Sequence, residues 1–203
     1  MRLASMRKSI VAALLVAAAS SAFSQSAPSA LGDQRHRVFL FGAGGGVATY
    51  DVDWGQGRML GAAGWADLTL DEGPRFLRGL GFEGEARDIA WGQSPTQPQK
   101  LREETFGAGG IYIWRQFRIA HPYVKFIGSY GNVDFPNPST YTHDSRTVSA
   151  LGGGLEVRAF RNVWGRADYE YQLWPALFAG QKTLDPQGFT FGAMYEFGVG
   201  PRQ

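Results

Sequence analysis

The stretch Val163–Trp174, Val-Trp-Gly-Arg-Ala-Asp-Tyr-Glu-Tyr-Gln-Leu-Trp, alternates two kinds of side chain from beginning to end. One set is apolar, small or tyrosine, and the other set contains Arg166, Asp168 and Glu170. Successive side chains of a β-strand point to opposite faces, so the pattern predicts a strand with one apolar and one charged face. A soluble sandwich would bury the apolar face, whereas a membrane barrel turns it toward lipid and the charged face toward its lumen.

The N-terminal residues have the composition of a secretory signal peptide. Three basic residues precede the apolar run Ile10–Ala19, and small residues follow it. This run is shorter than the ~20 apolar residues that a membrane-spanning helix needs. We therefore expect residues 1–24 to be a cleaved signal peptide, residues 25–37 a polar periplasmic lead-in, and residues 38–203 the exported domain.

Charge and cysteine content restrict the possible partners. The chain has 20 Lys and Arg and 18 Asp and Glu, and the three basic residues of the signal region leave 17 against 18 in the exported part. A nearly neutral domain is not expected to bind nucleic acid.

The chain has no cysteine, so we expect neither disulfides nor a lipid-modified cysteine. His36, His121 and His143 are scattered, so no metal site and no cofactor are predicted.

From Val38 onward, turn residues divide the chain into alternating segments of about ten residues, the spacing of tilted membrane strands. An even number of strands is expected of a single-chain bacterial barrel. The sequence therefore predicts an all-β fold, an eight-stranded antiparallel up-and-down transmembrane β-barrel. Its strands are placed at Val38–Tyr50, Met59–Leu70, Gly79–Trp91, Glu104–Arg115, Pro122–Asn132, Thr147–Phe160, Val163–Trp174 and Gly188–Phe197.

The last of these segments indicates which face meets lipid. Phe189, Phe191, Tyr195 and Phe197 share one side of it, opposite Glu196. A face of aromatic residues is typical of the lipid-facing wall of a membrane barrel. The alternative fold is a soluble lipocalin-like barrel, in which the same aromatic residues would fill an interior cavity.

Charged residues of both signs collect on the opposite face of the predicted strands. An eight-stranded barrel has an interior just wide enough for side chains, so these charges must pair across the lumen and plug it. Asp67, Lys125 and Glu196 lie on this face, and small glycines leave room for large inward side chains such as Trp65. The predicted lumen ion-pair network consists of Glu83, Glu85, Arg87, Glu156, Arg158, Arg166, Asp168 and Glu170.

Loop lengths predict the topology. The connections after the odd-numbered strands are long, and the longest, Val133–Arg146, contains Phe135, Pro136 and Tyr141. The other connections are short. Bacterial barrels have short periplasmic turns and long external loops, so we expect both ends of the barrel domain in the periplasm and a surface-binding role, if any, in the long loops.

Several of these segments also carry a family resemblance. They resemble the small outer membrane β-barrel proteins of the OmpA-like/opacity-type superfamily, over nearly all of the exported chain. The resemblance implies a monomer in the cell outer membrane that contacts membrane lipid and the barrel assembly machinery, with a structural or surface-interaction role and an unidentified ligand. It is carried by the segments Gly64–Leu70, Gly81–Arg87, His121–Phe126, Gly152–Glu156 and Asp168–Gln172.

Two other functions remain open, a narrow channel and a lipid-modifying enzyme. Some eight-stranded barrels that resemble this one hydrolyse or transfer lipid acyl chains with a serine, a histidine and a carboxylate. His143 and Ser145 are two residues apart and would share a strand face, with Glu156 downstream as the carboxylate. His143 lies in or beside the longest predicted loop, and no other part of such a motif is present, so catalysis is not expected.

Overall fold

The computed structural model describes residues 38–52, 58–91, 101–135, 142–177 and 182–199. The expected signal peptide and lead-in lie outside these residues. Within them, no helix is long and apolar enough to cross a membrane.

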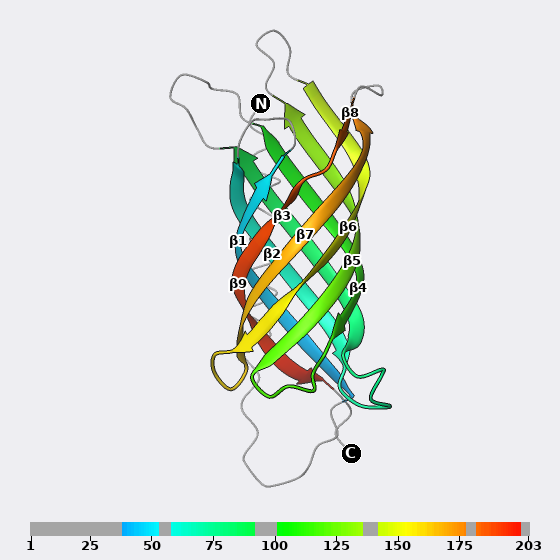
Figure 1. Cartoon of the computed structure of the whole chain (residues 1–203), viewed down its shortest axis with the longest axis vertical. Coiled ribbons are helices and arrows are strands. Elements are labelled where there is room, and N and C mark those ends of the chain that lie inside the picture. The colour runs from blue at the N-terminus through cyan, green and yellow to red at the C-terminus, as the bar shows by residue number, and fades with distance from the viewer. Residues whose placement is uncertain (1–37, 53–57, 92–100, 136–141, 178–181, 200–203) are drawn as a thin grey trace, which may run out of the picture. The chain divides into compact units, whose positions relative to one another are not determined.

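The described residues form one antiparallel sheet that closes on itself (Figure 1). Neighbouring strands follow the order β6-β5-β4-β3-β2-β1-β9-β7, and pairing of β6 with β7 completes the ring. The short strand β8 pairs with β7 alone. The strands are β1 Phe39–Asp51, β2 Arg58–Leu70, β3 Leu80–Trp91, β4 Arg102–Ile113, β5 Ala120–Phe135, β6 Thr142–Arg158, β7 Val163–Leu177, β8 Lys182–Leu184 and β9 Gln187–Val199.

The eight strands that close the ring confirm the predicted fold, while β8 and several boundaries differ from the prediction. The largest difference is at β5 and β6, which pair as far as Phe135 and Thr142, so most of the predicted loop Val133–Arg146 is strand. Asn, Asp and Ser indicated a loop here because they are common in turns. They sit in the ladder because Val133 and Val148 face inward and are buried, which holds both strands in register.

The two ends of the barrel are named here by their connections. The long-loop end, uppermost in Figure 1, joins β1 to β2, β3 to β4, β5 to β6, and β7 through β8 to β9. The short-turn end joins β2 to β3, β4 to β5, and β6 to β7. Phe39 and Val199 pair at the short-turn end, so the barrel begins and finishes there.

The two faces of the wall follow the alternation predicted from β7. Arg166, Asp168 and Glu170 point inward and are 2 to 4% exposed, whereas large apolar side chains such as Phe82 and Phe106 on the outer wall are 75% and 73% exposed. A lipocalin-like soluble barrel would show the reverse distribution. The exposed apolar wall is the surface that a membrane would cover.

Two inward glycines admit large aromatic rings into the narrow interior. A Cβ at Gly192 would lie 2.6 Å from the Trp65 ring, and one at Gly131 would overlap the Trp174 ring. Both indoles are buried inside the barrel. The glycines therefore leave the space that the rings occupy.

Candidate functional site

The interior of the barrel is the part of the molecule where charged side chains meet. Three buried cations, Arg87, Lys125 and Arg166, come from β3, β5 and β7. Carboxylates from β3 and β7 surround them, because residues i and i+2 of a strand share a face. We call these three cations, together with Glu83, Glu85, Asp168 and Glu170, the charged layer.

Lys125 is the centre of the charged layer. Its Nζ lies 2.5 Å from Glu85 Oε2, 3.1 Å from Glu170 Oε2, 3.2 Å from Asp168 Oδ2 and 3.3 Å from Glu83 Oε1. One ammonium group thus compensates carboxylates from two strands that are not neighbours in the sheet. The pattern had placed Lys125 on the charged face, but the predicted network omitted it.

Arg166 joins the same carboxylates to two aromatic rings. Its Nη2 lies 2.7 Å from Glu83 Oε2, and its Nε donates to Tyr123 Oη at 2.7 Å, while Tyr123 donates to Asp168 Oδ2 at 2.9 Å. The guanidinium also lies over the Trp65 and Tyr123 rings, at 4.9 and 4.4 Å from their centroids. Ion pairs, hydrogen bonds and ring contacts therefore fix its position together.

Arg87 connects the charged layer to the residues above it, toward the long-loop end. Its Nη1 lies 2.9 Å from Glu170 Oε1, its Nη2 pairs with Glu85, and its guanidinium lies 4.3 Å from the Tyr50 ring centroid. Gln172 donates to Glu170 Oε1 at 3.2 Å and accepts from Trp174 Nε1 at 2.8 Å. Gln172 is therefore the polar link between the carboxylates and the large indole.

Above the charged layer most inward side chains are apolar, although Glu103 is buried at the same level, opposite Ile89 and Val133. We call these apolar side chains the apolar cluster, which was not predicted from the sequence. Most inward positions near the long-loop end carry hydrophobic residues, so the alternation that placed charges inside also contained this signal. Its buried members are Ala48, Tyr50, Val52, Met59, Ala63, Ile89, Leu101, Val133, Val148, Trp174, Leu177 and Leu184.

Toward the short-turn end, Trp65, Trp164 and Met194 form a smaller cluster. Glu156 is buried there opposite His121, and its Oε1 has no hydrogen-bond partner among the described residues. At this rim, Arg115 Nη1 lies 2.6 Å from Glu196 Oε1.

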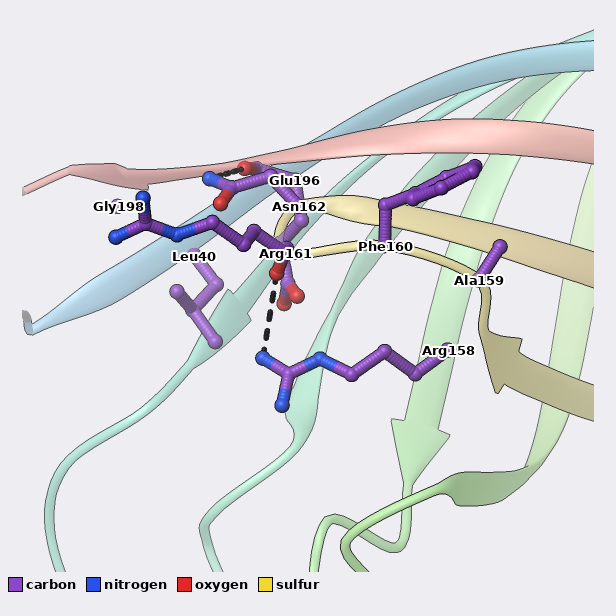
Figure 2. A pocket seen from close by; sticks show the side chains of 8 residues that line it. All are labelled: Leu40, Arg158, Ala159, Phe160, Arg161, Asn162, Glu196 and Gly198. Atoms are coloured by element: carbon purple, nitrogen blue, oxygen red, sulfur yellow. Dashed lines mark hydrogen bonds between the residues drawn. The ribbon is translucent and has the colours of Figure 1, made fainter.

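Arg158 is the one member of the predicted network that lies outside the barrel interior. It is exposed at the short-turn end, where its Nη2 donates to the Arg161 carbonyl at 3.2 Å and its guanidinium lies 5.3 Å from the Trp164 ring centroid. In Figure 2 its guanidinium points toward the Arg161 carbonyl. Both residues line an open pocket of about 620 Å³. The pattern misplaced Arg158 because it is the last residue of β6, where the strand gives way to the turn.

The predicted lipid-facing residues lie on the outer wall of β9. Phe189, Phe191 and Tyr195 are 42%, 54% and 39% exposed, and Phe197 is half-buried against Tyr195, with 4.5 Å between ring centroids. Of the predicted surface-loop residues, Phe135 is the last residue of β5. Pro136 and Tyr141 lie outside the described residues.

His143 and Ser145 lie on the outer wall of β6, near the long-loop end. Ser145 Oγ lies 3.2 Å from His143 Nε2, so the two side chains share a face as predicted from their spacing. The carboxylate beside His143 is Asp134 of β5, whose Oδ1 lies 2.6 Å from His143 Nδ1. Glu156 is inside the barrel near the opposite end of the same strand, so pairing it with His143 was wrong.

No group of three or more His, Cys, Asp or Glu side chains in the described part of the chain is arranged to hold a metal ion.

Solved structures with this fold include several bacterial surface barrels. Neisserial surface protein A is 15% identical with a TM-score of 0.60, over 78% of this chain and 97% of that one. Ail of Yersinia pestis, solved with the heparin analogue sucrose octasulfate, is 17% identical with a TM-score of 0.57, over 78% and 99% of the two chains. OprG of Pseudomonas aeruginosa is 12% identical with a TM-score of 0.55, over 81% and 98%. These identities support the fold alone.

No curated protein sequence matches the chain. The family model described as "Outer membrane protein beta-barrel domain" matches residues 10–197. That match takes in all eight strands of the closed ring up to Phe197. The exposed apolar wall and the closed antiparallel ring are the features such a protein needs to cross a membrane with strands. The chain belongs to the outer membrane β-barrel protein family.

Proposed function

We propose that this outer membrane barrel is a non-conducting protein whose role is structural or depends on contacts at its long-loop end. The observation that carries the proposal is the occupation of the interior by the charged layer and, above it, the apolar cluster. A water-filled path would have to pass both groups of side chains. A barrel of eight strands has little room beyond its own side chains, which argues against the alternative of a narrow channel.

The proposed orientation puts the long-loop end outside the cell, because bacterial barrels keep their short turns in the periplasm. The outer wall would then contact membrane lipid, and assembly machinery would insert the barrel. Aromatic residues such as Phe189 and Phe191 support this placement, since rings gather at the edges of the lipid-facing band.

The charge of the long-loop end bears on what could bind there. Among the described residues, acidic residues outnumber basic ones at this end. A polyanion such as the heparin analogue solved with Ail would be repelled by an acidic surface, so we propose a partner with a basic or neutral contact surface. The acidic residues are Asp51, Asp88, Glu104, Asp134, Asp144 and Asp185, and the basic residues are Arg58, Arg102, Arg146 and Lys182.

Conductance tests the non-conducting interior. The full-length protein, refolded and inserted into a planar lipid bilayer, is expected to give no steady ion conductance, while a porin inserted in the same bilayer serves as the positive control. Steady steps of porin size from the refolded protein would overturn the proposal.

Cysteine labelling tests the orientation, and the chain is suited to it because it has no cysteine of its own. Ser139→Cys places a thiol between β5 and β6, and Phe160→Cys places one in the β6–β7 turn, where Phe160 is 75% exposed. A membrane-impermeant maleimide is expected to label Cys at 139 on intact cells and Cys at 160 only after lysis. The opposite pattern would reverse the assignment of the two ends.

A further inference from the structure

Asp134, His143 and Ser145 form a continuous line of polar contacts on the outer wall of the barrel. His143 Nδ1 lies 2.6 Å from Asp134 Oδ1, and His143 Nε2 lies 3.2 Å from Ser145 Oγ. Each ring nitrogen of the histidine thus has its own partner, a carboxylate on one side and a hydroxyl on the other. This is the order of groups that activates a serine: acid, base, nucleophile.

The antiparallel ladder builds this arrangement from two strands. His143 and Ser145 are two residues apart on β6 and therefore share a face, and Asp134 lies directly opposite His143 on β5. Side chains directly opposite one another on one face of an antiparallel pair have Cβ atoms about 5 Å apart. All three groups are consequently placed by the ladder and not by a loop.

Each group has the exposure its role requires. The Asp134 side chain is 24% exposed, so the carboxylate is partly withdrawn from water, while the His143 side chain is 52% exposed and can be reached from outside. A carboxylate at Nδ1 holds the proton on that nitrogen and leaves the lone pair of Nε2 facing Ser145. In this tautomer His143 can accept the serine proton.

Asn132 completes the group. It lies opposite Ser145 in the ladder, and its Oδ1 accepts from Ser145 Oγ at 2.6 Å. In the free protein the Ser145 proton therefore has two acceptors, Asn132 Oδ1 and His143 Nε2. Catalytic hydrogen bonds are commonly long before substrate binds, so the 3.2 Å contact fits a base that engages on binding.

The position on the barrel indicates the substrate. Towards the middle of the wall, the same outer face of β4, β5 and β6 presents Phe106, Tyr130 and Leu151, which are 73%, 58% and 63% exposed. The polar line thus stands at the edge of the apolar band. An acyl chain lying along that band would bring its ester carbonyl to the level of Ser145.

We propose that Ser145, His143 and Asp134 form a hydrolytic site for the acyl esters of membrane lipids. Ser145 Oγ attacks the ester carbonyl carbon while His143 Nε2 takes its proton; the bond to the alcohol oxygen then breaks, and that oxygen leaves with the proton from Nε2. A water molecule next attacks the acyl-serine, giving its proton to Nε2, and the fatty acid leaves as Ser145 recovers the proton. The Asn132 amide carries an N–H donor for the oxyanion.

The site goes beyond the proposed non-conducting role and stands apart from it, because it uses the outer wall and not the lumen. The conductance and labelling experiments therefore do not test the hydrolytic site, and a failure to detect hydrolysis would not contradict the proposed function.

The test uses the full-length protein refolded in lipid vesicles that contain a phospholipid with a fluorogenic acyl ester. The wild type is expected to release the fluorophore, and Ser145→Ala, His143→Gln and Asp134→Asn to lower the rate by a hundredfold or more, the contribution typical of a positioned acid–base group. Thr147→Ala is the matched control, since Thr147 is the next residue along β6 on the same outer face. All variants should keep the heat-modifiable gel migration of a closed barrel.

A second measurement separates a reactive serine from a structural one. A fluorophosphonate ester should attach to Ser145, be found there by mass spectrometry, and fail to attach in His143→Gln. Wild-type hydrolysis by Ser145→Ala, or no hydrolysis and no attachment in the wild type, would overturn the site. Cleavage of a soluble p-nitrophenyl ester but not of vesicle lipid would overturn the lipid substrate class.

Discussion

The charged layer and the apolar cluster occupy the same barrel and come from the same strands, yet different forces hold them. β3 contributes Glu85 and Arg87 to the charged layer and Ile89 to the apolar cluster, and β7 contributes Glu170 and then Trp174. Height along the barrel, more than the identity of the strand, decides which kind of contact an inward residue makes, and Glu103 of β4 is an exception. The charged layer requires particular partners, whereas the apolar cluster requires volume and shape.

The difference matters for strand register. A slip of two residues keeps every side chain on its own face, so the apolar cluster would still bury hydrophobic groups. The charged layer would not survive such a slip, because Lys125 meets four carboxylates only in the observed register. The ion pairs therefore favour one register over others, whereas the hydrophobic residues stabilise the barrel without distinguishing between registers.

The largest effect should come from removing a cation from the charged layer. Seven buried carboxylates and three buried Lys or Arg side chains occupy the described interior, so each cation compensates more than one acid. Arg166→Ala should lower the free energy of unfolding by about 3–5 kcal/mol, the cost of leaving buried charge uncompensated. Urea titration in detergent micelles, followed by gel migration, measures it.

Arg102→Ala is the control for that experiment. Arg102 pairs with Asp88 and Glu104 on the outer surface, where its side chain is 36% exposed. An exposed pair contributes less than about 1 kcal/mol. Equal losses for Arg166 and Arg102 would mean that the interior is as well solvated as the surface.

The next effect tests the apolar cluster. Met59→Ala should cost about 2–5 kcal/mol, because it removes a fully buried side chain and leaves a cavity. The neighbouring residue gives a matched comparison on the opposite face: Met59 is 1% exposed, while Leu60 is 61% exposed. Leu60→Ala leaves no cavity and should cost less. The same unfolding assay would contradict this account of the interior if the order were reversed.

A smaller effect is expected at the polar link between the two groups. Gln172→Ala removes the acceptor of Trp174 Nε1 and a donor to Glu170, and an unsatisfied buried polar group costs about 1–3 kcal/mol. Gln187→Ala serves as its control, since Gln187 accepts from Tyr169 in an exposed position. A Gln172 loss no larger than the Gln187 loss would show that the two groups are independent.

The smallest quantity is a coupling energy. Single and double replacements of Glu83 and Arg166 by alanine form a thermodynamic cycle across their 2.7 Å contact. The double variant should lose less than the sum of the single losses, by about 0.5–3 kcal/mol, because it removes both members of a buried pair. Additive losses would indicate that Arg166 is held by its ring contacts and not by its ion pair.

Much of this architecture could be predicted from the sequence because alternation is a strictly local signal. Period two in Val163–Trp174 indicated which residues of β7 face the lumen, and the same pattern placed Lys125 among the charges. It was harder to predict which inward residues contact each other, because those contacts depend on how far the strands are shifted relative to one another along the barrel. For that reason Lys125 was left out of the predicted network and the apolar cluster was not foreseen.

The wrong predictions fall at strand ends, where side chains no longer alternate between the packed interior and the outer wall. Arg158 falls on the inward face by count but lies beyond the packed interior. His143 was placed at a loop boundary and paired with Glu156, because a carboxylate supplied by the neighbouring strand leaves no mark in the local sequence. Asp134 could have been found only from the register of β5 against β6.

The seam between β1 and β9 has a consequence for how the chain folds. These are the first and last strands of the ring, and they pair along their whole length, from Phe39 with Val199 to Asp51 with Gln187. Every other pairing of the ring, except β7 with β9, can form before β9 is available, so an incomplete chain presents two open edges, β1 and β7. Open edges recruit other chains. Pairing of β1 with β9 joins the segments that are farthest apart in the sequence, so it has the largest loop-closure entropy cost and is expected to be the slowest step of folding. The risk of aggregation is greatest until this step is complete.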